Sequence, residues 1–158
     1  MMMAEPVPCL SVVVPTYKRP ELLERCLAAL MTQHLDSTAY EIIVVDDGND
    51  LQTRCLVDSW AKWGRPILRY ISAAKTNGPA AARNSGWRAA QGDIIAFTDD
   101  DCLPEPGWLL AGANAFSEGV SALGSGQVSL RLPTQIPAQQ QRGLAQEPIV
   151  VRDSPMVG

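Results

Sequence analysis

"LSVVVPTYKRPELLERCLAALMTQ" (residues 10–33) holds the pattern that decides the fold. Residues 10–15 form an apolar, β-branched run that ends at a proline, which is typical of a strand covered on both faces. A helical pattern starts at Pro20, because proline fits the first helical turn and apolar residues then recur at helical spacing. The stretch therefore predicts a strand, a short loop and a helix.

The same unit recurs along the chain. Three further segments repeat the strand type, at residues 40–48, 66–73 and 93–98. Helices are expected from Asn49 or Asp50 to Gly64, over residues 77–92 and over residues 104–119. One or two strands broken by glycine follow at residues 120–132. Strands that alternate with helices predict an α/β fold with a mostly parallel, Rossmann-like sheet flanked by helices.

Two residue types inside the predicted helices call for a packing explanation. Gly86 lies within the third helix, where glycine costs up to about 1 kcal/mol relative to alanine, so close packing or a ligand is expected there. The four tryptophans are spread over the predicted helices and are expected to pack the core, at Trp60, Trp63, Trp87 and Trp108.

Length and composition bound the domain organisation. The 158 residues suffice for one α/β domain with a sizeable core, and the hydrophobic fraction of 46% is that of a globular protein. Residues 1–132 are expected to form this unit. Residues 133–158 are rich in Pro, Gln and Gly and have little periodicity, which predicts an irregular tail or the start of a missing second half. On this interpretation the fold is incomplete.

Charge and cysteine usage exclude some classes of function. The formal net charge is -4 and the basic residues are scattered, so nucleic acid is not an expected partner. The four cysteines form no C-x-x-C pair, which favours free thiols in a reducing, cytoplasmic compartment. No apolar stretch approaches the roughly 20 residues that a membrane span needs, so no membrane segment is expected.

Polar clusters follow three of the predicted strands, at residues 16–19, 46–47 and 99–101. Because ligands of parallel sheets bind outside the carboxyl ends of the strands, these clusters are expected to share one edge. The last cluster is three consecutive carboxylates, which repel one another unless a cation lies among them. Carboxylate oxygens suit Mg²⁺ or Mn²⁺, which usually completes its shell with water and substrate phosphates. The pattern predicts a divalent cation that holds a diphosphate.

Structural explanations compete with this one at several positions. Asp46, Asp47 and Asp50 are also typical of a turn followed by a helix cap. Lys18 and Arg19 are expected to be a solvated pair in the first loop, with an approach to the diphosphate as the alternative. Arg83 and Asn84 are equally consistent with exposed helix positions.

Three stretches, in this order, resemble the donor-binding half of family 2 glycosyltransferases. They are "SVVVPTYKRP", "EIIVVDDGND" and "GPAAARNSGWRAAQGDIIAFTDDD", and the resemblance covers about residues 9 to 132. It implies the GT-A fold, in which a nucleotide-activated sugar, with a UDP-sugar expected here, is transferred to a glycan or another hydroxyl acceptor. Such enzymes are metal-dependent, use Mn²⁺ or Mg²⁺, and in this family invert the anomeric centre.

The resemblance also implies roles for single residues. Pro15, Thr16 and Tyr17 would lie against the base, Asp47 would hydrogen-bond the base, and Arg83 would lie beside the nucleotide. The triplet resembles the family's D-x-D motif. Asp99 and Asp100 would lie near the ribose and sugar, and Asp101 would bind the metal.

The catalytic base of similar enzymes is a carboxylate in their second half. Past Leu132 the chain offers only Glu147 and Asp153, in no comparable context, so no base is assigned. These residues are therefore expected to bind the donor without completing the transfer.

Two other functions remain open on the sequence. The missing base and the irregular tail are consistent with a truncated, non-catalytic fragment or an interaction module. "VVDDG" (residues 44–48) is also similar to the acidic pocket of phosphoacceptor receiver domains. The order of the acidic clusters along the strands disfavours the receiver, because its acidic pair follows the first strand and here the pair follows the second.

Overall fold

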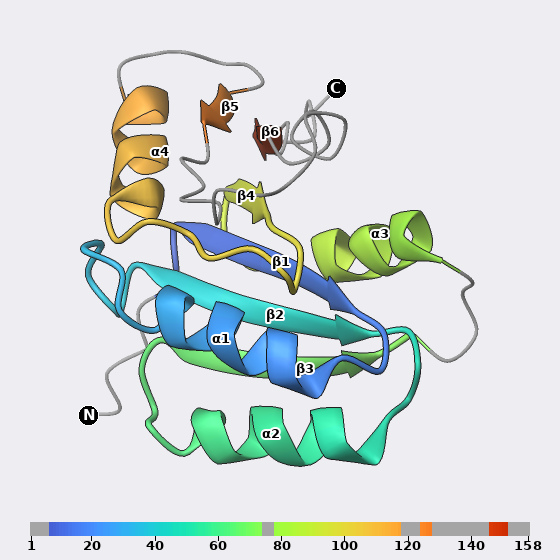
Figure 1. Ribbon diagram of the computed structural model, residues 1–158. Coiled ribbons are helices and arrows are strands. Elements are labelled where there is room, and N and C mark those ends of the chain that lie inside the picture. Colours follow the sequence, from blue (N-terminus) through green and yellow to red (C-terminus); the bar gives the residue numbers. More distant parts are fainter. Residues whose placement is uncertain (1–6, 74–77, 118–123, 128–145, 152–158) are drawn as a thin grey trace, which may run out of the picture.

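The computed structural model describes residues 7–73, 78–117, 124–127 and 146–151 (Figure 1). The strands are β1 (Leu10–Thr16), β2 (Tyr40–Asp46), β3 (Ile67–Ser72), β4 (Ile94–Phe97), β5 (Gly124–Gln127) and β6 (Gln146–Val151). The helices are α1 (Pro20–Leu30), α2 (Leu51–Ala61), α3 (Pro79–Ala89) and α4 (Trp108–Ser117). The predicted alternation of strands and helices is confirmed from β1 to α4.

One sheet unites the strands, in the order β3-β2-β1-β4-β6-β5. β1 pairs in parallel with β2 and β4, and β2 pairs in parallel with β3. Thr16 at the end of β1 lies opposite Asp46 at the end of β2. The mostly parallel sheet flanked by helices is the predicted fold class, and the carboxyl ends of its central strands meet at one edge.

β6 differs from the prediction. The sequence predicts an irregular segment from residue 133 onward, but residues 146–151 form a strand that pairs antiparallel with β4 and with β5. Its apolar run is only three residues long and directly follows Pro148, and proline within a short run argues against a strand. The backbone pairing with β4 stabilises this strand, which its own short apolar run does not predict.

Helices cover both faces of the sheet (Figure 1). Alternate residues of each central strand point to opposite faces: Val12 and Ile42 join the cluster beneath α1, α2 and α4, whereas Val13 and Ile43 join the cluster beneath α3. Every residue of β1 and β2 is buried. A strand buried on both faces explains why these segments read as continuous apolar runs.

Gly86 confirms the expected close packing. A Cβ atom at this position would overlap Cγ1 of Val13 and lie 2.9 Å from Cγ2 of Val45. Glycine therefore lets α3 lie directly on β1 and β2, which fixes the start of this helix above the strand ends.

The prediction that the tryptophans are core residues is only partly right. Trp60 and Trp108 are partly buried and pack against the core, but Trp63 is 69% exposed and Trp87 is 37% exposed. The ring of Trp63 lies on that of Trp60, with centroids 5.2 Å apart, beyond the last turn of α2. A position past the helix end has no sheet to cover it.

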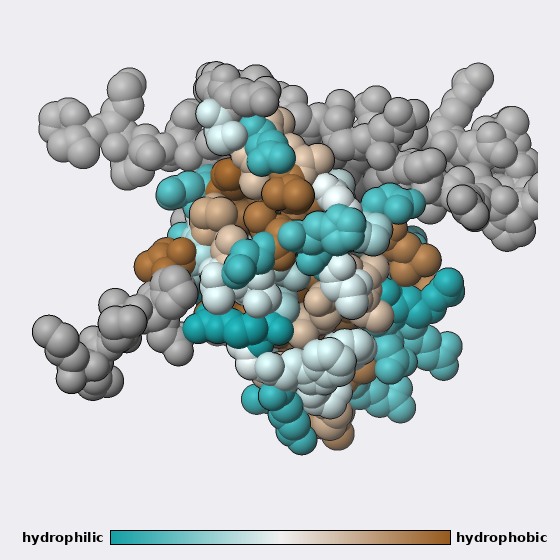
Figure 2. Space-filling view, turned by 90° about the vertical axis from the view of Figure 1, so that its left-hand side faces the viewer, coloured by the Kyte–Doolittle hydropathy of each residue, from teal (hydrophilic) through white to brown (hydrophobic). Residues whose placement is uncertain are grey.

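The amino ends of β1, β2 and β3 lie at the left of Figure 1, and Figure 2 shows that side of the molecule. Apolar side chains gather in the upper part of this face and hydrophilic ones surround them (Figure 2). Among the described residues, no helix is both long and apolar enough to cross a membrane.

Candidate functional site

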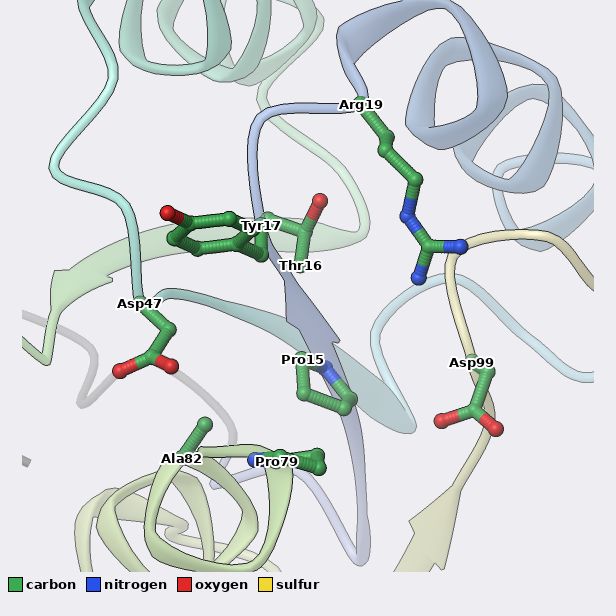
Figure 3. A pocket seen from close by; sticks show the side chains of 8 residues that line it. All are labelled: Pro15, Thr16, Tyr17, Arg19, Asp47, Pro79, Ala82 and Asp99. Atoms are coloured by element: carbon green, nitrogen blue, oxygen red, sulfur yellow. The ribbon is translucent and has the colours of Figure 1, made fainter. Parts of the chain in front are cut away.

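A cavity of about 300 Å³ lies where the carboxyl ends of β1 and β2 meet the start of α3 (Figure 3). Its lining residues come from four separate segments of the chain and are Pro15, Thr16, Tyr17, Arg19, Asp47, Pro79, Ala82 and Asp99. The predicted clustering of polar residues at one sheet edge therefore occurs. Five of the residues predicted from the sequence, Pro15, Thr16, Tyr17, Asp47 and Asp99, line this single cavity.

The loop after β1 presents a flat aromatic ring to the cavity. The side chain of Tyr17 is 55% exposed although it lies next to the buried Thr16. Lys18 follows in the left-handed region, with φ of 49°, and its Nζ lies 5.5 Å from the centre of the Tyr17 ring. An exposed ring beside a cavity offers a planar ligand a stacking surface.

Asp46 is a structural residue. Its carboxylate is buried and accepts hydrogen bonds from the backbone of Gly48 at 2.8 Å, the backbone of Asp50 at 2.7 Å and Tyr70 Oη at 2.8 Å. Burial, together with the Asp46 carboxylate, raises the pKa of Tyr70, which therefore stays a donor. Asp46 shapes the turn after β2.

Asp50 caps α2, because its side chain accepts from the backbone N–H of Thr53 at 3.0 Å. The turn and the helix cap that these aspartates are also typical of are therefore present, with Asp46 in the turn and Asp50 as the cap.

Asp47 is arranged differently from its neighbours. Its Oδ2 accepts a hydrogen bond from the backbone N–H of Gly78 at 3.0 Å. Its Oδ1 is buried and receives no hydrogen bond from the part of the chain that the structure describes. Asp47 lines the cavity, so its carboxylate brings hydrogen-bond acceptors to this wall.

Asp99 and Arg83 form an ion pair at the cavity edge, with Asp99 following β4 and Arg83 projecting from α3. Both side chains are about one third exposed, so neither is fully withdrawn from a ligand. The backbone carbonyl of Asp99 accepts from Cys26 Sγ at 3.5 Å, and burial raises the pKa of this thiol, which stays neutral. All four cysteines are free, as the sequence predicts.

Asp100 is fully buried and connects β1 to the segment after β4. Its Oδ2 accepts a hydrogen bond from Thr16 Oγ1 at 2.8 Å. Arg19 Nη2 lies 2.7 Å from its Oδ1, a charge contact without hydrogen-bond geometry, since Oδ1 accepts no hydrogen bond among the described residues. Burial raises the pKa of Asp100, and the contacts with Thr16 and Arg19 oppose that rise. Of the two residues predicted to lie near the ribose and sugar, Asp99 lines the cavity, whereas Asp100 contacts its wall through Thr16.

Asp101 is the surface member of the triplet. Its side chain is 44% exposed, and Arg19 Nη1 lies 3.8 Å from its Oδ2. It lines a shallow depression with Leu22, Arg25 and Leu103 and is not among the residues that line the main cavity. Arg19 contacts both Asp100 and Asp101 and lines the cavity, so it links the main cavity to the depression beside Asp101.

The acidic triplet has the donor chemistry of a magnesium or manganese ligand but is not a closed cage. No group of three or more His, Cys, Asp or Glu side chains within the described ranges is placed to hold a metal ion by itself. A single exposed carboxylate suits these cations, because they commonly take one or two carboxylates and complete the shell with water and phosphate oxygens. Asp101 fits that mode of binding.

Arg19 is only in part the solvated loop residue that the sequence predicts. Its side chain is 48% exposed, but its guanidinium lies against two carboxylates. Pro79 and Ala82 line the cavity and were also not singled out. The available signal was the position of Arg19 immediately before Pro20, where the chain turns into α1 above the strand ends.

Comparisons with known proteins place the chain in a family. The sequence pattern of glycosyl transferase family 2 matches residues 11–148. Glycosyltransferase AglE of Haloferax volcanii is 33% identical over 132 residues, which are 83% of this chain and 43% of that protein. The chain thus spans less than half the length of this curated relative.

Two solved structures share the arrangement of elements. A mannosyltransferase from Pyrobaculum calidifontis, in complex with GDP-Man and Mn²⁺, has a TM-score of 0.58 at 32% identity, over 63% of this chain and 29% of that one. Staphylococcus aureus TarS (residues 1–349), in complex with UDP-GlcNAc, has a TM-score of 0.64 at 29% identity, over 80% of this chain and 37% of that one.

Proposed function

Because the chain belongs to glycosyl transferase family 2, we propose that its cavity binds the nucleotide of an activated sugar, as the donor-binding part of an enzyme that transfers the sugar to a hydroxyl acceptor. The observation that carries the proposal is that Asp47 and the exposed ring of Tyr17 line the same cavity at the carboxyl ends of the strands. A nucleobase has the flat face and the edge N–H that these two groups require. The proposal covers residues 1–132.

The base lies between the loop after β1 and the start of α3 in this proposal. Pro15 and Tyr17 supply apolar and aromatic surface, and Asp47 accepts a hydrogen bond from the edge of the base. Asp99 and Arg83 lie further along the cavity edge, where ribose hydroxyls and phosphate would pass. Thr16 and Asp100 act through their mutual hydrogen bond, which holds the loop after β1 to the triplet.

Asp101 is the residue we assign to a divalent cation, Mn²⁺ or Mg²⁺. Support comes from its exposed carboxylate at the end of the triplet and from the Mn²⁺ in the Pyrobaculum calidifontis mannosyltransferase structure. Such a cation, when bound, neutralises the charge that develops on the departing nucleoside diphosphate. Arg19 contacts Asp101 and would exchange part of this contact for the cation or the phosphates.

The donor proposed is a UDP-sugar and the acceptor is a glycan or another hydroxyl compound. The two solved relatives carry different nucleotides, UDP-GlcNAc and GDP-Man, so the choice of base depends on this chain's own contacts. Inversion of the anomeric centre is part of the proposal, with a carboxylate base that we do not assign within residues 1–132.

A thermal-shift experiment tests the function. Saturating UDP with Mn²⁺ should raise the melting temperature of the protein, UDP with a chelator should raise it less, and uridine should show no dependence on Mn²⁺ because it has no phosphates. A melting temperature that does not change with UDP, CDP or GDP in the presence of Mn²⁺ would argue against a nucleotide site.

A further inference from the structure

Arg19 contacts two carboxylates of the acidic triplet through different nitrogens. Its Nη2 lies 2.7 Å from Oδ1 of Asp100, and its Nη1 lies 3.8 Å from Oδ2 of Asp101. Arg19 also lines the cavity, and Figure 3 shows its side chain extending from the loop before α1 toward the side of the cavity on which Asp99 lies. One guanidinium therefore lines the proposed nucleotide site and pairs with the residue assigned to the cation.

The two contacts of Arg19 differ in strength. The Asp100 side chain is fully buried, and a buried carboxylate that loses its counter-charge destabilises the fold, so this close contact holds the arginine in place. The contact with Asp101 is longer and joins two side chains that are 48% and 44% exposed, an arrangement that contributes little to stability. Arg19 can therefore release Asp101 while it stays on Asp100.

This asymmetry affects a cation that binds to Asp101 alone. The cation must first replace the Nη1 contact, and it then lies beside a guanidinium that Asp100 holds nearby. Like charges at such a separation repel each other. A diphosphate reverses the balance, because its oxygens bind both divalent cations and guanidinium groups. The same site is thus unfavourable for a cation alone and favourable for a cation together with a diphosphate.

We propose that Arg19 is a positioning residue that keeps the cation site at Asp101 weak until a diphosphate enters the cavity, so that cation and donor bind together. This inference rests on the proposed nucleotide site. It gives Arg19 two opposite effects, since the same charge opposes the cation alone and favours the diphosphate. A residue that only stabilised the fold would weaken both ligands.

The first test is the binding of Mn²⁺ without nucleotide, measured by electron paramagnetic resonance of the free ion. Arg19→Gln should bind Mn²⁺ at least about tenfold more tightly than the wild-type protein, a ratio equivalent to about 1.4 kcal/mol. Arg25→Gln is the matched control, because Arg25 is exposed and lines the same depression as Asp101. This control removes an equal charge and should change the affinity for Mn²⁺ by less than about twofold.

The second test is calorimetric titration with UDP and with uridine in the presence of a chelator. Arg19→Gln should bind UDP at least about threefold more weakly than the wild-type protein, because the diphosphate loses a positive charge. Uridine has no phosphates, so both proteins should bind it equally. An equal loss of affinity for UDP and uridine would show that the substitution distorts the cavity and would contradict the proposed role.

The outcomes separate this inference from the proposed function. If the wild-type protein binds UDP with Mn²⁺ but Arg19→Gln does not bind Mn²⁺ alone more tightly, the inference fails and the nucleotide site remains. If the wild-type protein does not bind UDP with Mn²⁺, the proposed function itself fails.

Arg19→Lys decides the matter if Arg19→Gln does not fold. Lysine keeps a positive charge for the buried Asp100 but carries it on one nitrogen instead of a two-pronged guanidinium. The variant should therefore fold, release Asp101 and bind Mn²⁺ alone at least about threefold more tightly than the wild-type protein. A folded lysine variant with the wild-type affinity for Mn²⁺ would overturn the inference.

Discussion

Asp101 has a side chain that is 44% exposed, against 38% for Asp99 and 0% for Asp100, and its contact with Arg19 is as long as 3.8 Å. Asp99 is paired with Arg83, and Asp100 is buried against Thr16. At the scale of single residues, three identical side chains in sequence thus have three environments. Of the three, Asp101 has the longest ion-pair contact, so its exchange for a cation breaks neither a close ion pair nor a buried hydrogen bond.

Replacing Asp101 by asparagine should remove the metal-dependent part of nucleotide binding. The wild-type protein should bind UDP at least about tenfold more tightly with Mn²⁺ than with a chelator, a ratio equivalent to about 1.4 kcal/mol. Asp101→Asn should bind UDP with equal affinity in both conditions, as measured by calorimetric titration. Asp36→Asn is the control for charge, and an Asp101→Asn protein with the wild-type metal dependence would refute the assignment.

Thr16 should matter for stability because its hydroxyl satisfies a buried carboxylate. Thr16→Val removes the donor to Asp100 while preserving side-chain shape, and should lower the free energy of unfolding by about 1 to 3 kcal/mol. Thr38→Val is the matched control, because Thr38 donates to Asp36 at an exposed site and its loss should cost less than about 1 kcal/mol. Equal losses in urea unfolding of the two variants would contradict this role.

At the scale of elements, α3 begins at the contact between Gly78 and Asp47 and also carries the side chain of Arg83. The way this helix packs on the sheet therefore positions much of the cavity. Gly86→Ala forces a methyl group against Val13 and Val45 and should lower the free energy of unfolding by about 1 to 3 kcal/mol. Gly107→Ala, where a Cβ atom meets nothing within 4 Å, should cost less than about 1 kcal/mol. Chemical denaturation compares them, and equal losses would contradict the packing argument.

Tyr40 ties β2 to the end of α1 and should make stability depend on alkaline pH. Its Oη donates to the carbonyl of Leu30 at 2.8 Å, and burial raises the pKa of Tyr40 to about 12. In the unfolded chain tyrosine ionises near pH 10. Since the folded pKa is the higher one, the contribution is complete below about pH 10 and is lost as the pH rises toward 12.

Tyr40→Phe should therefore be less stable than wild type at pH 8 and should lose less stability between pH 9 and 11. Urea unfolding across that range measures both effects. A variant with the same alkaline slope as the wild-type protein would show that Tyr40 does not ionise differently in the folded state.

The elements that the sequence predicts are those whose pattern is local. β1 and β2 contain runs of apolar, β-branched residues because both faces are covered, and α1 follows a proline start signal. β6 escaped prediction because its three-residue apolar run beside Pro148 depends on pairing with β4. Local pattern does not encode such partners.

The site shows the same division. That the acidic clusters meet at one edge follows from a parallel sheet, and Asp47 and Asp99 do line one cavity. The parallel sheet alone does not determine which of the neighbouring residues Asp46 and Asp47 faces the cavity. Their contacts distinguish them, because Asp46 accepts from Tyr70 and Asp47 accepts from Gly78. The position of Arg19 before Pro20 is a local signal, but its partner Asp100 lies in a distant segment and cannot be identified from the residues around Arg19.

At the scale of the whole molecule, the two ends of the sheet have different polar chemistry. At the amino ends of the strands, buried Glu41 accepts from Ser11 Oγ at 2.6 Å and from Arg69 Nη1 at 2.8 Å. The backbone N–H of Gln91 also donates to Glu41, at 2.7 Å. This network is satisfied from within the chain, whereas the opposite end has an oxygen of Asp47 that the described residues leave without a donor.

Arg69→Met should therefore destabilise the protein without a direct effect on nucleotide binding. Removing the guanidinium leaves a buried carboxylate without its counter-charge, which should cost about 3 kcal/mol of unfolding free energy. The double variant Glu41→Gln/Arg69→Met should recover part of this loss. The affinity for UDP of the folded fraction should stay within about twofold of wild type, or about 0.4 kcal/mol. A large loss of affinity in the still-folded variant would contradict the separation of the two ends.

The central claim is that one cavity at the carboxyl ends of the strands holds a nucleotide diphosphate together with a divalent cation. Anomalous diffraction from crystals of the protein with UDP and Mn²⁺ tests it most directly. The account predicts a manganese peak within about 2.5 Å of an Asp101 carboxylate oxygen, and a uracil ring against Tyr17 with its edge N–H on the Asp47 carboxylate. A manganese peak away from residues 99–101, or UDP bound outside the cavity, would contradict it.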